Sequence, residues 1–166
     1  VYLEVRGVRR VESGYMGGQD PAPTYETVCA GETGHAEVVR VTYDPAVVRY
    51  DQLLQILYSV VADPTLLNHQ GADHGAQYRT AIGPLSAEQR AVASAYLAQM
   101  RRSPVWDDPI VARIEEPLRF YPAEDYHQDF LLNNPDKPYI RRWDAPKLVA
   151  LREKFPALYR RTYRTG

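Results

Sequence analysis

The sequence predicts an α+β protein, an α/β sandwich in which helices pack on a sheet. Two observations lead to this fold class. Hydrophobic residues switch repeatedly between the alternation typical of strands and the i, i+3, i+4 spacing typical of helices. The predicted elements follow the order helix, strand, strand, helix, strand, helix, strand. A hydrophobic content of 45% and a charged fraction of 25% are those of a globular protein.

The opening of the chain predicts the end of a helix rather than a whole one. Val1–Arg6 places valines four residues apart, and Gly7 is a helix stop. A strand follows at Val8–Tyr15, and Thr24 can cap a short helical turn that ends at Cys29. No strand precedes the opening helix, so we expect the domain to be truncated at its N-terminus.

The remaining elements are predicted from the same patterns, with turn and capping residues between them. They are a strand at His35–Tyr43, a helix at Tyr50–Ala62 stopped by Asp63-Pro64, a polar loop at Thr65–Gln77, a strand at Tyr78–Ile82, a helix from Ser86 to about Arg102, strands at Val111–Glu115 and Leu118–Tyr121, an acidic and aromatic turn at Glu124–Phe130, and a last helix near Pro146–Phe155. No linker or repeat divides these elements. We therefore expect one domain over residues 1–166, with an irregular C-terminal extension from about residue 135.

Charge and cysteine content narrow the partners and the compartment. The net charge of −1 argues against nucleic acid or an anionic membrane as the main partner. No apolar run approaches the ~18 residues of a membrane span. The single cysteine allows no internal disulfide, which fits a reducing compartment, so we expect a cytoplasmic protein.

Glu37 is the leading candidate for acid chemistry. Alternation in its strand places it on one face with Val39 and Val41. A carboxyl at the end of an apolar face is penalised in its ionised form, which raises its pKa and lets it donate a proton near neutral pH. The alternative is a glutamate at a fraying strand end that faces water.

Cys29 precedes Glu37 by eight residues, so the two could form a nucleophile and its proton donor. A thiolate needs a cation, a base or a helix N-terminus nearby. Cys29 is instead expected at the end of its helical turn, where the helix dipole disfavours negative charge. The residues favour an inert, small side chain.

The loop Asn68–Arg79 is rich in polar groups, and its two glycines let the backbone bend around Asp73. Asp73 could orient a substrate, or it could cap its own loop. His69 and His74 lie in the same loop, but their spacing matches no known metal motif. We expect no metal site.

Four segments together resemble the A-type peptide methionine sulfoxide reductases. They are GYMGG (Gly14–Gly18), PTYETVCAGETGHAEVV (Pro23–Val39), DPTLLNHQGADHGAQYRTAI (Asp63–Ile82) and FYPAEDYHQDFL (Phe120–Leu131). The resemblance extends from Gly7 to about Tyr139. It implies a ferredoxin-like mixed sheet with packed helices.

The resemblance also implies a reaction and its partners. Members of this family reduce the S epimer of methionine sulfoxide, free or in proteins, through a sulfenic acid on a cysteine. The implied reductant is an external thiol protein, usually thioredoxin, and no cofactor is implied. Oxidised proteins and free methionine sulfoxide are the implied substrates, and we expect a monomer.

Site residues are implied one by one. Glu37 matches the glutamate that gives a proton to the sulfoxide oxygen. Tyr25 and Tyr78 match the tyrosines whose hydroxyls hold that oxygen, and Asp73 matches the aspartate that shapes the pocket. Cys29 matches a cysteine that is not the general nucleophile, although a resolving role occurs in some members.

The chain departs from the family in one respect. The family's nucleophile lies in a Gly-Cys-Phe-Trp motif, which by register falls about seven residues, or two helical turns, before Val1. We therefore expect the chain alone to be inactive and its parent protein to be an enzyme. The alternative is a pseudoenzyme that binds oxidised methionine or Met-rich partners without reducing them.

Overall fold

The structure, a computed structural model, describes residues 1–161, which combine five α-helices with short sheets. The last five residues of the predicted domain, 162–166, lie outside the described residues. The helices are α1 (Tyr25–Cys29), α2 (Tyr50–Ile56), α3 (Ala87–Arg102), α4 (Phe130–Asn133) and α5 (Ala145–Lys154). The strands are β1 (Val8–Met16), β2 (Ala36–Tyr43), β3 (His69–Gln70), β4 (Asp73–His74), β5 (Ala81–Ile82), β6 (Arg113–Ile114) and β7 (Tyr121–Pro122).

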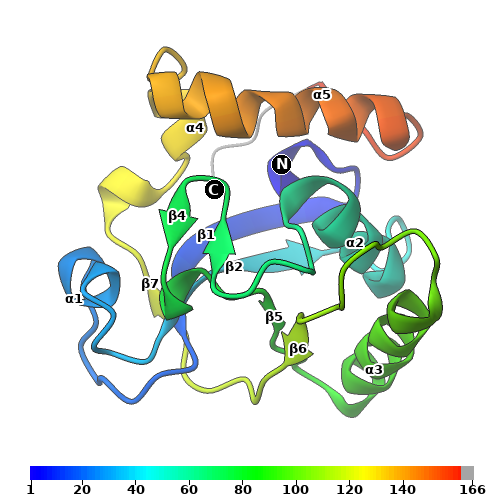
Figure 1. Cartoon of the computed structure of the whole chain (residues 1–166). Helices are drawn as coiled ribbons and strands as arrows, with labels where there is room; N and C mark the ends of the chain where they lie inside the picture. The colour runs from blue at the N-terminus through cyan, green and yellow to red at the C-terminus, as the bar shows by residue number, and fades with distance from the viewer. Residues whose placement is uncertain (162–166) are drawn as a thin grey trace.

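The central sheet is antiparallel, with strand order β2-β1-β7 (Figure 1). In its register Tyr15 lies opposite Glu37 and Ser13 opposite Val39, so these four side chains share one face. β3 and β4 form a separate hairpin, and β5 pairs with β6 in parallel. The single mixed sheet that the resemblance implied is thus divided into three among residues 1–161.

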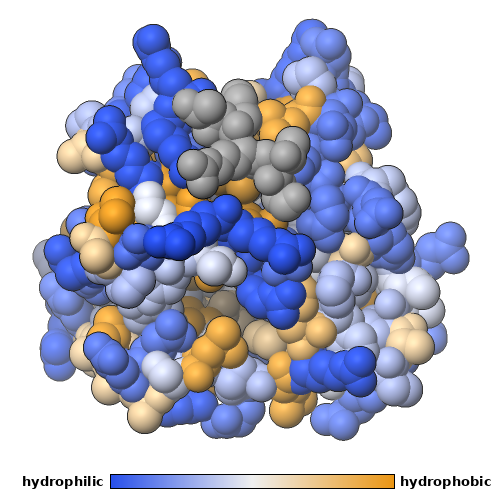
Figure 2. Space-filling model, turned by 180° about the vertical axis from the view of Figure 1, so that it is seen from behind, coloured by the Kyte–Doolittle hydropathy of each residue, from blue (hydrophilic) through white to orange (hydrophobic). Residues whose placement is uncertain are grey.

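The two larger core clusters meet at α2. Leu53 and Ile56 pack with the N-terminal segment and α5, whereas Leu54 packs with α3 and β5. This division agrees with Figure 1, where α5 crosses the top of the view above the central sheet and α3 lies at the lower right. From behind, hydrophilic residues cover most of the surface, and hydrophobic ones form smaller groups between them (Figure 2).

Several predicted elements are confirmed and others need correction. The helices at Tyr50–Ala62 and from Ser86 are present, the first ending in a π-helical turn at Leu57–Val61. The prediction of a helix at Val1–Arg6 is wrong. Tyr2–Glu4 forms only a 3-10 turn, because the chain next forms a bridge between Val5 and Tyr159.

The other corrections are shorter strands and a more regular C-terminal part. β5 is limited to two residues because the chain first makes the 3-10 turn Ala76–Tyr78, and the predicted polar loop contains the β3–β4 hairpin. The extension predicted as irregular holds a π-helical turn at Ile140–Asp144, which leads directly into α5, and α5 confirms the predicted last helix near Pro146–Phe155. Ile140 and Leu151 are buried there, which explains why this segment folds against the body of the protein.

Candidate active site

Glu37 lies near the start of β2, on the face that alternation predicted. That face is open at this end, where Glu37 is exposed and Val39 is 47% exposed, so the expected burial of Glu37 is not found. Desolvation by neighbouring atoms nevertheless raises the pKa of Glu37, the charge of Asp73 raises it further, and a hydrogen bond from Tyr78 opposes both. Because the carboxyl is accessible to water, screening moderates the size of this shift but not its direction.

Tyr78 ends the 3-10 turn Ala76–Tyr78, beside both Glu37 and α1. Its hydroxyl oxygen lies 3.9 Å from Sγ of Cys29. The side-chain amide of Gln77 donates to the carbonyl of Cys29 at 3.1 Å, which joins the turn to α1. Burial, the charge of Glu37 and the thiol all raise the pKa of Tyr78, so its hydroxyl is a proton donor at neutral pH.

Tyr25 is the first residue of α1 and shares one side of this short helix with Cys29, four residues later. Thr24 caps the helix by accepting from the amide of Thr27, as the sequence predicted. Contact with the Cys29 thiol, together with burial, raises the pKa of Tyr25 to about 12. The Tyr25 hydroxyl is therefore also protonated at neutral pH.

Asp73 begins β4, at the tight end of the β3–β4 hairpin. Its Oδ2 accepts a hydrogen bond from the Tyr139 hydroxyl at 2.5 Å. Its charge contributes to the raised pKa values of Glu37, Tyr25 and Tyr78. The structure thus brings the four predicted site residues within electrostatic range of one another.

Cys29 lies at the same place, although the sequence favoured an inert residue. Its immediate neighbours are the hydroxyls of Tyr25 and Tyr78. Neither tyrosine can accept a proton from the thiol near neutral pH, because both pKa values are raised. Cys29 also ends α1, so it does not lie at the N-terminus of its own helix.

Three further residues adjoin the site and received no role from the sequence. Tyr139 holds Asp73, Glu124 accepts from the backbone amide of Tyr25 at 2.8 Å, and the ring of His127 lies 4.2 Å from that of Tyr25. The motif FYPAEDYHQDFL contains two of them, Glu124 and His127. The motif signalled their presence, but only the folded arrangement shows what they contact.

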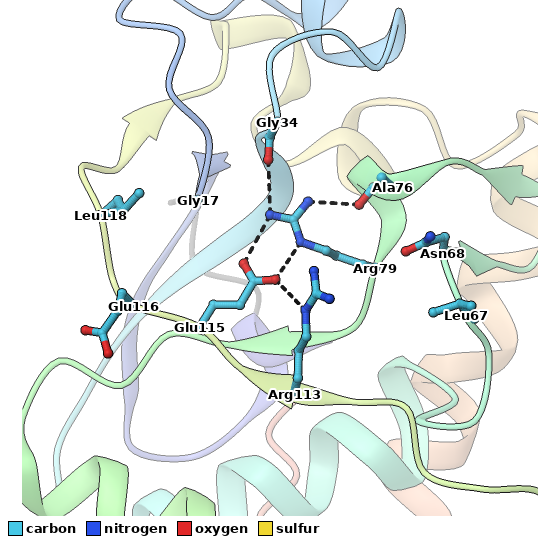
Figure 3. Close-up of a pocket in the computed structure, with 10 residues that line it drawn as sticks. All are labelled: Gly17, Gly34, Leu67, Asn68, Ala76, Arg79, Arg113, Glu115, Glu116 and Leu118. Atoms are coloured by element: carbon cyan, nitrogen blue, oxygen red, sulfur yellow. Dashed lines mark hydrogen bonds and ion pairs between the residues drawn. The ribbon is translucent and has the colours of Figure 1, made fainter.

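The larger cavity, about 550 Å³, lies elsewhere and includes none of the four predicted residues. Arg79 lies in its wall, with its guanidinium between the carbonyl of Gly34 and the carboxylate of Glu115 (Figure 3). Arg113 contacts the same carboxylate. Its charged groups are thus largely paired with one another, so we do not assign the chemistry to this cavity.

A smaller cavity of about 200 Å³ lies over another part of the sheet face that carries Glu37, where Ser13 and Val39 line it. It is lined by Val1 at one side, by Val39 on β2 and by His127 and Phe130 beyond.

Within residues 1–161 no group of three or more His, Cys, Asp or Glu side chains converges to hold a metal ion. Among the helices of the described residues, none has both the length and the hydrophobicity of a membrane span.

An acidic carboxyl beside two tyrosine hydroxyls, on an α/β scaffold, defines an enzyme that can protonate an oxygen atom of its substrate. Residues 1–158 match the family model of peptide methionine sulfoxide reductase. The chain therefore belongs to the peptide methionine sulfoxide reductase family, whose members are oxidoreductases that reduce methionine sulfoxide.

Individual relatives agree with this assignment. Peptide methionine sulfoxide reductase MsrA 2 of Mesorhizobium japonicum is 49% identical over 159 residues, which are 96% of this chain and 82% of the relative. MsrA of Deinococcus radiodurans is 47% identical over 155 residues, 93% of this chain and 75% of the relative. The crystal structure of reduced Mxr1 from Saccharomyces cerevisiae is 31% identical and superposes with a TM-score of 0.67, covering 79% of this chain and 74% of that one.

Proposed function

We propose that the protein reduces the S epimer of methionine sulfoxide, free or in proteins, and that Glu37 is the acid of the reaction. A cysteine thiolate attacks the sulfoxide sulfur while Glu37 gives a proton to the oxygen. The substrate sulfur gains two electrons and becomes a thioether, and the attacking cysteine becomes a sulfenic acid. The observation that carries this proposal is the raised pKa of Glu37 beside the hydroxyl of Tyr78.

Each remaining site residue has a place in this reaction. The hydroxyls of Tyr25 and Tyr78 hold the sulfoxide oxygen and stabilise the charge that develops on it. Asp73, fixed by Tyr139, shapes the pocket and keeps the pKa of Glu37 high. Cys29 is not assigned the role of nucleophile, because the two hydroxyls that contact it, those of Tyr25 and Tyr78, are protonated at neutral pH.

The attacking sulfur is proposed to precede Val1, in the Gly-Cys-Phe-Trp motif that the family register places there. A cavity lined by Val1, Ser13 and Val39 connects the N-terminal residue with the sheet face that also carries Glu37, which supports this placement. Among residues 1–161, β2 and β5 each have one edge without a strand partner. A strand from the same segment would join them into the ferredoxin-like sheet.

The sulfenic acid is then reduced by thiols from an external reductant of the thioredoxin type, with loss of water. No cofactor takes part. Oxidised proteins and free methionine sulfoxide are the substrates, and the protein acts as a monomer.

The test is a stereospecific assay of the protein as its gene encodes it, with dithiothreitol as the reductant. Reduction of the S epimer of a methyl sulfoxide, with no reduction of the R epimer, is the expected result. Binding of methionine sulfoxide without turnover would instead support the pseudoenzyme. Equal reduction of both epimers would contradict the proposed substrate.

A further inference from the structure

Glu124 connects two parts of the chain that are distant in sequence. Its Oε1 accepts a hydrogen bond from the backbone amide of Tyr25 at 2.8 Å, and its Oε2 accepts one from the hydroxyl of Tyr15 at 2.7 Å. We propose that Glu124 is a positioning residue of the reductase, which ties α1 to the central sheet and thereby fixes the place of the Tyr25 hydroxyl. This rests on the role proposed above for Tyr25.

The sheet side of this link is rigid. Tyr15 is only 2% exposed and packs with Val28 and Ala123. In the register of β1 and β2 it lies directly opposite Glu37. Glu124 therefore ties Tyr25 to the same strand pair that carries the acid.

The short helix α1 depends on the link to Glu124 for its stability. α1 has five residues, far fewer than the 12–15 at which an isolated helix becomes even marginally stable in water. Its one fully buried side chain is Val28, and Tyr25 is 37% exposed. The amide of Tyr25 lies in the first turn, where no intrahelical acceptor exists, and Glu124 supplies the acceptor.

The segment that carries Glu124 is itself held firmly. The side chain of Gln128 accepts from the amide of Ser13 at 2.9 Å and donates to its carbonyl at 3.0 Å, as a further strand residue would. Burial lowers the pKa of His127, while the charge of Glu124 raises it, and the net effect is a lowered pKa. The His127 ring is therefore mostly neutral at neutral pH, and it packs 4.2 Å from the ring of Tyr25.

The consequence for catalysis is geometric. A misplacement of about 1 Å in a catalytic group can cost on the order of 10²-fold in rate. Glu124→Ala should lower kcat by up to that factor and change KM less. Glu124→Gln keeps an oxygen that accepts from the Tyr25 amide, so it should restore most of the rate.

A double-mutant comparison separates positioning from general stability. It uses the protein as its gene encodes it and measures kcat for Glu124→Ala, Tyr25→Phe and both together. If Glu124 acts through Tyr25, the double variant is no slower than Tyr25→Phe alone. Asp125→Ala is the matched control, since Asp125 is exposed on the same turn and should leave kcat unchanged. Losses that multiply, or an equal loss in Glu124→Gln and Glu124→Ala, would overturn the proposal.

A second readout is independent of activity. In the 166-residue chain, NMR titration of ¹³C-labelled tyrosine, with Tyr25 assigned by Tyr25→Phe, should give a pKa of about 12 for Tyr25. Glu124→Ala should move it toward the ordinary value of about 10 as the thiol contact loosens. An unchanged titration in Glu124→Ala would refute the link, whereas an inactive wild-type protein would refute only the proposed function.

Discussion

The hydroxyl of Tyr78 and the thiol of Cys29 lie 3.9 Å apart, which places the chain's one cysteine at the site beside a hydroxyl that stays protonated at neutral pH. We therefore expect Cys29→Ser to leave kcat nearly unchanged in the protein as its gene encodes it. The reason is that Tyr25 and Tyr78, with raised pKa values, cannot ionise this thiol. Dithiothreitol-dependent reduction assays check this expectation, and a loss of turnover comparable with that of Glu37→Gln would show that Cys29 is essential.

Glu37→Gln removes the proposed proton donor while keeping the size of the side chain. General acid catalysis contributes about 10²–10⁴-fold, so kcat should fall by a factor in that range at neutral pH. In the wild type, kcat/KM should decline as the pH rises through the raised pKa of Glu37, because only the protonated carboxyl is active. Profiles of rate against pH test both points. A variant that retained this decline would exclude Glu37 as the acid.

Substitutions of Asp73 and Tyr78 should shift the pH at which kcat/KM declines in opposite directions. The charge of Asp73 raises the pKa of Glu37, so Asp73→Asn should shift the decline to lower pH. The hydrogen bond from Tyr78 lowers the same pKa, so Tyr78→Phe should shift the decline to higher pH, besides reducing kcat. The measurement is kcat/KM against pH for both variants. Shifts of the same sign in the two variants would contradict this electrostatic account.

Arg79 should contribute mainly to stability. Its side chain is 9% exposed and binds Glu115 through two nitrogens, at 2.7 and 3.1 Å, whereas Arg113 contacts the same carboxylate from a position 58% exposed. Arg79→Met should lower the free energy of unfolding by about 3 kcal/mol. This is the low end for breaking a buried ion pair, because Arg113 still contacts Glu115. Arg113→Met, the matched control, should cost about 0–1 kcal/mol. Urea unfolding measures both, and equal costs would contradict the distinction.

The ion pair between Arg79 and Glu115 also makes the stability of the protein depend on pH. Burial tends to raise the pKa of Glu115, but the hydrogen bonds and charges of Arg79 and Arg113 outweigh it, and the pKa is lowered. A lowered folded pKa contributes stability at neutral pH that is lost as the pH falls through that pKa. The cost of Arg79→Met should therefore shrink in acid.

Local patterns predicted much of the fold. Alternation gave β2 its faces, Thr24 and Ser86 marked the starts of α1 and α3, and Asp63-Pro64 marked the end of the helix that begins at Tyr50. The failures came where distant contacts decide. Val1–Arg6 follows a bridge to Tyr159 rather than its helical spacing, and the start of the extension predicted as irregular forms a helical turn because Ile140 is buried.

The site likewise combines residues that the sequence predicted with contacts that only the fold reveals. Glu37, Tyr25, Tyr78 and Asp73 were identified through motifs, and the fold brings them together. The burial of Glu37 was overestimated, because a strand pattern shows which face a residue occupies but not what covers that face. Tyr139 and Glu124 lie 66 and 99 residues from Asp73 and Tyr25, the residues they hold, and no local pattern reports such contacts.

In the proposed reaction, this chain supplies the acid half of the site and Cys29 does not supply the sulfur. The most direct test is dithiothreitol-dependent reduction of methionine (S)-sulfoxide by the 166-residue chain alone. We expect no turnover by the chain alone and turnover by the protein as its gene encodes it. Robust turnover by the chain that disappears in Cys29→Ser would contradict it.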